Sequence, residues 1–161
     1  MARRSREEEE FTVVFRDLFP RAYRVAYRML DDRGAAEDVA AEAMSRAFAR
    51  WSTVSNLDYR DAWVMRVTMN LCLNSLRRHS LLVAPPDPTS IEDATATRLA
   101  LVAALAALPT RQREVVVLRH LGGLPELEVA RALGIGAGTV KTHLKRGLEA
   151  LRGQLLEQPA I

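Results

Sequence analysis

The chain has 161 residues, of which 48% are apolar, and this composition excludes disorder along its whole length. Its 23 Lys and Arg against 20 Asp and Glu give a net charge of +3, which excludes a histone-like polycation and confines any nucleic-acid contact to local patches. The single cysteine excludes an intrachain disulfide and a cysteine-rich zinc site, and no run of about 18 apolar residues predicts a membrane span. We expect a soluble, unexported protein of the cytoplasm.

Proline divides the chain into two parts. The segment 81–95 holds three closely spaced prolines: Pro85, Pro86 and Pro88. Their fixed backbone angles favour an extended linker over a helix. The segments on either side show a 3.6-residue apolar period, and neither shows the two-residue alternation of strands. We therefore predict an all-α protein with two small helical domains, residues 1–80 and 96–161, joined by the proline-rich linker.

The first domain opens with two predicted helices that meet at a proline. Apolar residues within 11–18 line one face of the opening helix, and Pro20 can occupy the first turn of the next, which the Asp-Asp-Arg-Gly turn at 31–34 ends. A third helix, 35–51, keeps its apolar residues at helical spacing and carries mixed charge on its outer face. A turn-like segment then leads to the helix 61–78, whose nearly all-round apolar character predicts a central, buried position.

One narrow polar stripe interrupts this apolar helix. Its members are spaced four, four, three and one residues apart: Arg66, Asn70, Asn74, Arg77 and Arg78. Amide and guanidinium groups in a line are suited to phosphates and base edges, which favours a nucleic-acid contact. Alternatively, a buried helix needs one solvated edge, and the last two arginines complement the negative end of the helix dipole. The spacing alone leaves both interpretations open.

The second domain begins with a Leu- and Ala-rich helix, 94–108, which Pro109 ends. Thr110 is the predicted N-cap of the next helix, 111–121, because its hydroxyl can accept a hydrogen bond from a free N–H of the first turn. The pair Gly122-Gly123 stops that helix.

A helix-turn-helix pattern follows. Two small residues, Ala130 and Gly134, permit a close approach and a sharp turn between helices that we predict at about 126–133 and 139–152. Apolar side chains supply the predicted contacts between the two helices: Leu127, Leu133, Ile135, Val140, Leu144, Leu148 and Leu151. The second helix presents polar and basic side chains away from its apolar face, as a helix that enters the DNA major groove does.

The candidate DNA-contacting residues of this second helix are Thr139, Lys141, Thr142, His143, Lys145 and Arg146. Lysine and arginine reach guanine edges in a major groove, and a threonine near the helix start can offer its hydroxyl and N–H to phosphate. The motif therefore predicts DNA binding. The alternative is a basic helix hairpin that serves only to pack.

The chain resembles the extracytoplasmic-function sigma factors of the sigma-70 family, and most of all the actinobacterial SigE-like group. Three segments carry the resemblance: FRDLFPRAYRVAYRMLDDRGAAEDVAAEAMSRAFARW, AWVMRVTMNLCLNSLRR and LPTRQREVVVLRHLGGLPELEVARALGIGAGTVKTHLKRGLEAL. They cover nearly all of the chain outside the linker and the termini. The resemblance implies a promoter-specificity subunit of bacterial RNA polymerase, without enzymatic activity or cofactor, that recognises the −35 and −10 elements, melts the −10 region and directs transcription initiation.

The resemblance also implies roles for individual residues. The first domain, similar to sigma region 2, would dock on the β′ clamp helices of core polymerase through Asp38, Glu42 and Arg46. The polar stripe would hold the non-template strand of the −10 element while one base is flipped out, since an extruded base regains stacking and hydrogen bonds in the protein. The family's usual Gln-Glu pair reads Ala41-Glu42 here, so one polar contact is missing.

The second domain resembles sigma region 4, which implies that its recognition helix reads the −35 element of promoter DNA and that the domain meets the polymerase β flap. Thr142-His143 stands where the family often has Ser-Arg, so the preferred bases cannot be carried over from relatives. The resemblance implies no membrane insertion. It leaves open whether an anti-sigma protein holds the chain inactive.

Two other classes of protein compete with this interpretation. A two-domain regulator with a LuxR-like DNA-binding domain is the alternative, because TVKTHL also suits that family, but it would need a sensor or receiver with alternating strands in the first half. An enzyme has little support, because the three histidines lie far apart without a metal or catalytic motif and the Gly-Ile-Gly-Ala-Gly run follows a helix rather than a strand.

Overall fold

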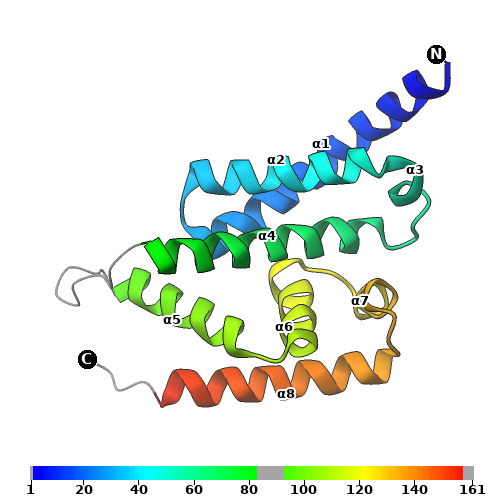
Figure 1. Cartoon of the computed structure of the whole chain (residues 1–161). Helices are drawn as coiled ribbons and strands as arrows, with labels where there is room; N and C mark the ends of the chain where they lie inside the picture. The colour runs from blue at the N-terminus through cyan, green and yellow to red at the C-terminus, as the bar shows by residue number, and fades with distance from the viewer. Residues whose placement is uncertain (1, 83–92, 158–161) are drawn as a thin grey trace.

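The computed structural model describes residues 2–82 and 93–157, which contain helices and turns and no strand (Figure 1). The predicted all-α class is confirmed. The first half holds α1 (Ala2–Leu30), α2 (Arg33–Ala49), α3 (Trp51–Val54) and α4 (Arg60–Leu82). The second half holds α5 (Asp93–Ala107), α6 (Thr110–Val116), the π-helical turn η1 (Val117–Leu121), α7 (Glu126–Leu133) and α8 (Ala137–Leu156). Most of the predicted linker, with its three prolines, lies outside the described residues.

A single helix replaces the two helices predicted at the start of the chain. α1 continues through Pro20, so the prediction that this proline begins a new helix is wrong. An internal proline removes the hydrogen bond to the fourth residue before it, here Arg16, but both residues are exposed and water can satisfy that carbonyl. Leu18 and Ala22 are buried on either side of the proline, so packing against α2 and α4 holds the helix together.

The turn between α1 and α2 has the predicted position. Asp31 adopts a positive φ of 53°, which ends α1, and Asp32 then caps α2 by accepting a hydrogen bond from the Ala35 N–H at 2.7 Å. One face of α2 is buried against α1 and α4, and its charged face remains exposed.

α4 is the central helix of the structure, as its apolar sequence predicted. It packs against α1 and α2 on one side and against α7 and η1 of the second half on the other (Figure 1). Its fully or nearly fully buried residues are Ala62, Val64, Met65, Thr68, Met69, Cys72 and Leu73. The buried apolar residues of the two halves form one continuous cluster, so the halves are packed together.

The helix after Pro109 differs from the prediction at both ends. Thr110 is the first helical residue and makes no capping hydrogen bond, because the backbone at Pro109 already takes the extended N-cap position with φ −51° and ψ 141°. At the other end the helix widens into η1, where the Gly122 N–H donates to the Val117 carbonyl at 2.9 Å. Gly123 then turns the chain with a φ of 65°.

The helix-turn-helix is confirmed, with one change in its packing. α7 has the predicted bounds, and Gly134 ends it in the left-handed conformation with a φ of 65°. Leu127 is 64% exposed and takes no part in the predicted apolar contacts; Val129, which is fully buried, lies on the inner face instead. Leu148, at 40% exposure, likewise lies at the margin of the core.

α8 begins two residues earlier and ends four residues later than the predicted helix, and it packs on α6, α7 and α5. It crosses α6 at Gly147, where an added Cβ would lie 2.7 Å from Val116 Cγ2. The close approach therefore requires glycine at this position.

Candidate nucleic-acid interface

The polar stripe on α4 is exposed along most of its length. Four of its members are exposed, although the same helix buries its apolar residues in the core: Asn70, Asn74, Arg77 and Arg78. Neither asparagine side chain forms a hydrogen bond with another described residue. These amides therefore remain available to an external ligand such as a nucleotide base.

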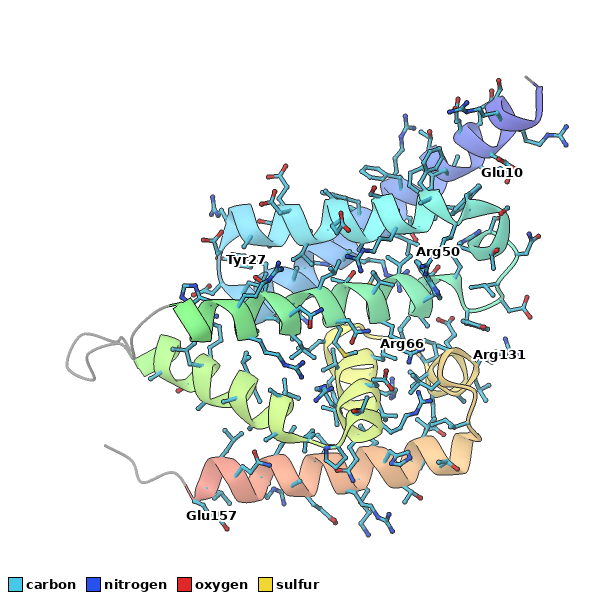
Figure 2. The ribbon with its side chains drawn as sticks, in the orientation of Figure 1. Glu10, Tyr27, Arg50, Arg66, Arg131 and Glu157 are labelled. Atoms are coloured by element: carbon cyan, nitrogen blue, oxygen red, sulfur yellow. The ribbon has the colours of Figure 1, made fainter. Side chains whose placement is uncertain are left out.

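Arg66, the first member of the stripe, has a different environment. Its Nε donates a hydrogen bond to Glu114 Oε1 at 2.9 Å, and the Arg66 side chain is 37% exposed. Figure 2 shows Arg66 between α4 and the segment formed by α6 and η1. Arg66 thus differs from the four other stripe residues, because its guanidinium is paired with a residue of the second half of the chain.

Glu114 is the residue that the sequence analysis missed. Its side chain is only 4% exposed, and Arg111 binds its second oxygen at 3.0 Å. A buried carboxylate is rare unless it is paired, and here two guanidinium groups share it. The sequence feature that could have indicated this residue is its position: Glu114 is a lone acidic residue directly before the apolar run Val115–Leu118, which is buried.

The candidate recognition helix α8 presents a basic face to solvent. Thr139, Lys141, Lys145 and Arg146 are exposed. Among the described residues, Lys141 has an ion-pair partner: its Nζ lies 3.9 Å from Glu126 Oε1. This pair is partly exposed and contributes little. The positive charge of α8 is therefore accessible to a polyanion.

Thr142 and His143 are less available than their neighbours. Thr142 is exposed, but its hydroxyl donates to the Gly138 carbonyl at 3.1 Å, so only its acceptor capacity is left for a ligand. His143 is half-buried, and its Nδ1 is enclosed without a hydrogen-bond partner among the described residues. The His143 side chain therefore lies partly inside the domain, and less of it is accessible to the DNA major groove than of its neighbours.

The candidate polymerase-contact set lies on the exposed face of α2. Arg46 Nε donates to Glu42 Oε1 at 2.7 Å, one turn away, and Asp38 is exposed on the same face. A shallow groove of about 260 Å³ runs beside this face, and its lining includes Asp38, Glu42 and Arg78. The structure thus brings two acids of the polymerase-contact set next to the end of the α4 stripe.

Two features of the described residues bear on metal ligands and on the single thiol. No group of three His, Cys, Asp or Glu among them is placed to hold a metal ion. Burial raises the pKa of the Cys72 thiol to about 12, so this cysteine is neutral at physiological pH and its thiol is a poor nucleophile. None of the described helices is long and apolar enough to cross a membrane.

Comparison with known families matches both halves of the chain. Residues 14–81 match sigma-70 region 2, and residues 98–151 match sigma-70 region 4. The chain is 36% identical over 156 residues to the RNA polymerase sigma-E factor of Streptomyces coelicolor, covering 93% of this chain and 86% of the relative. It is 31% identical to the ECF RNA polymerase sigma factor SigW of Bacillus subtilis, covering 83% and 82% of the two chains.

Solved structures show the same fold. The structure of CnrH in complex with the cytosolic domain of CnrY matches with a TM-score of 0.62 at 20% identity, over 95% of this chain and 91% of that chain. The sigma factor RpoE from Bartonella quintana, crystallised with the anti-sigma factor NepR, matches with a TM-score of 0.56 at 20% identity, over 93% and 99% of the two chains.

Proposed function

The chain belongs to the sigma-70 family and is a promoter-recognition subunit of RNA polymerase, and we propose that its surfaces on α2, α4 and α8 divide this work among them. The resemblance predicted from the sequence is thus confirmed at the level of the family. Core RNA polymerase and promoter DNA are the partners of such a subunit. The finer assignments below are proposals about individual residues.

The α8 surface reads the −35 element. The observation that carries this proposal is the division of one helix into a buried apolar face, with Val140 and Leu151, and an exposed cationic face. Lys145 and Arg146 are the candidates for base edges in the major groove, while Thr139, near the start of α8, can bind a phosphate. Lys141 contributes to the same positive surface beside Glu126.

The α4 stripe captures the melted −10 element. Asn70 and Asn74 hold bases of the non-template strand, and the two arginines that follow them bind its phosphates. The support is that both asparagines are exposed and unbonded among the described residues on a helix that is otherwise packed on two sides. Arg66 joins this surface only when it is released from Glu114.

The α2 face binds core polymerase. In this proposal Asp38, Glu42 and Arg46 contact the β′ clamp helices, residues 1–80 form the region 2 domain, and residues 96–161 form the region 4 domain that meets the β flap. The chain itself makes no covalent change and needs no cofactor, because polymerase performs the chemistry. It acts in the cytoplasm, where the polymerase is.

The charges on α2 can be tested without disturbing the fold. The double variant Asp38→Lys, Glu42→Lys should compete less well for core polymerase, because both side chains are exposed and charged groups orient association. Competition against a second sigma factor measures the effect, and helical circular dichroism checks the fold. Unchanged competition by a folded double variant would exclude this face as the docking surface.

Reconstitution with core RNA polymerase tests the function as a whole. Core enzyme with the chain should give run-off transcripts from a subset of genomic fragments, and core enzyme alone should not. A LuxR-like regulator would instead bind duplex DNA without core enzyme and would give no transcript with core enzyme alone. That outcome would contradict the proposal and favour the alternative.

A further inference from the structure

Among the described residues, two polar contacts at separate places join the two halves of the chain. In the first, Arg66 of α4 pairs with Glu114 of α6 at 2.9 Å. In the second, Arg98 of α5 donates to the Met29 carbonyl at 3.3 Å and lies 3.6 Å from Asp31 Oδ2. Each contact links residues that are far apart in the sequence, so each must form or break as the halves dock or separate.

Glu114 has a local partner and a distant one. Arg111, one turn earlier in its own helix, binds Oε2 at 3.0 Å, and Arg66 binds Oε1 from the other half. If the halves separate, Arg111 still compensates the carboxylate, which also becomes hydrated as the covering helix leaves. The negative charge of Glu114 is therefore compensated within the second half even without Arg66. The Arg66–Glu114 pair can then break when the halves separate without leaving an unpaired buried charge.

Arg66 also belongs to the stripe that faces promoter DNA. A guanidinium binds carboxylate and phosphate oxygens with the same planar set of donors, so a group paired with Glu114 cannot fully engage a phosphate. α4 is also the helix that packs against α7 and η1, and the Arg66–Glu114 pair places the second half beside the N-terminal member of the stripe. The docked arrangement thus occupies one residue of the proposed DNA surface, Arg66, while the other four stripe residues stay exposed.

We infer that Glu114 holds Arg66 in place of a DNA phosphate, so that the docked halves form a closed state in which the α4 surface has reduced affinity for the −10 strand. Opening exchanges the carboxylate of Glu114 for a phosphate of single-stranded DNA at the same guanidinium. The contact of Arg98 with the end of α1 supports the closed state at a second point. This inference rests on the proposed role of the α4 stripe.

The test compares three variants of the full chain in the absence of polymerase. Glu114→Gln weakens the interdomain contact, and Arg111→Gln is the matched control that removes the other partner of the same carboxylate within one half. Small-angle X-ray scattering gives the radius of gyration, and fluorescence anisotropy gives the affinity for a fluorescein-labelled single-stranded DNA pool of random sequence. Asp31→Asn weakens the second contact at an exposed site, so it remains informative if Glu114→Gln does not fold.

Glu114→Gln should enlarge the radius of gyration and raise the affinity for single-stranded DNA by roughly two- to tenfold, whereas Arg111→Gln should change neither. Asp31→Asn should produce a smaller change in the same direction. Opening without a gain in DNA affinity, or no change in either quantity, would overturn the inference. Run-off transcription by the wild-type chain tests the proposed function separately, so failure of one can be distinguished from failure of the other.

Discussion

The candidate DNA surfaces on α4 and α8 differ in how much of the fold surrounds them. α4 packs against α1, α2, α7 and η1, and one member of its stripe is paired with the opposite half. α8 packs on α5, α6 and α7 with its buried face, and its cations face solvent; within the described part of the chain their one ion pair is that of Lys141 with Glu126, at 3.9 Å. The difference shows that a helix at the margin of the fold keeps its cationic face exposed, whereas a central helix can have one polar residue of its exposed stripe paired with a distant segment.

The largest expected effect concerns the packing of α7, which lies against α8. Leu133 is 5% exposed and Leu127 is 64% exposed on the same short helix, α7. Leu133→Ala should lower the free energy of unfolding by about 2 to 5 kcal/mol because it leaves a cavity, while Leu127→Ala should cost about 0.5 kcal/mol or less. Urea denaturation measures both. Equal losses would mean that α7 packs on the face predicted from the sequence.

The second test addresses the function of the α4 stripe. Replacing Asn70 and Asn74 with alanine should reduce open-complex formation by tenfold or more, since the amide hydrogen bonds of both residues to bases are lost and each hydrogen bond contributes about 0.5 to 1.5 kcal/mol. Closed-complex binding should change little, because strand capture follows melting. Permanganate footprinting measures the open complex, and a pre-melted bubble template serves as the control. If the bubble does not restore activity even in part, the stripe is a solvated edge of the helix.

Two variants of α8 distinguish base contacts from phosphate contacts on the proposed −35 surface. Arg146→Ala should remove about 1 to 3 kcal/mol of discrimination at one −35 position, because a bidentate contact to guanine is lost. Lys141→Ala is the matched variant on the same face. Both are measured on a randomised −35 library at two salt concentrations, where a phosphate contact weakens all sequences alike and lowers the salt slope by about one. A uniform loss for both would leave Lys145, Thr142 and His143 as the remaining candidates for base readout.

The smallest effect compares helix starts in the two halves. Asp32→Ala should lower the free energy of unfolding by about 0.5 to 2 kcal/mol, because its side chain accepts the 2.7 Å hydrogen bond that caps α2. Thr110→Ala should change it by only about 0.5 kcal/mol or less, since Thr110 makes no capping bond in α6. Thermal denaturation at fixed pH compares the two. A large loss of stability in Thr110→Ala would mean that Thr110 does cap this helix, as the sequence predicted.

The sequence by itself determined the features that depend on near neighbours. The all-α class followed from apolar spacing, and the turn at Asp32 and the end of α7 at Gly134 followed from capping chemistry and from a positive φ. The exposed cations of α8 followed from the same spacing, because residues three and four apart share a helix face. These features involve contacts within about one helical turn.

Only the tertiary structure decided which segment each helix face packs against. Packing on both sides of Pro20 keeps α1 continuous where local chemistry allowed a break, and the approach of α8 sets which leucines of α7 are buried. The pairing of Arg66 with Glu114, 48 residues away, could not be predicted from spacing. Helical periodicity determines which residues lie together on one face, but the partner of that face depends on how distant segments pack. In this chain that packing pairs Arg66, one arginine of the predicted DNA surface, with Glu114.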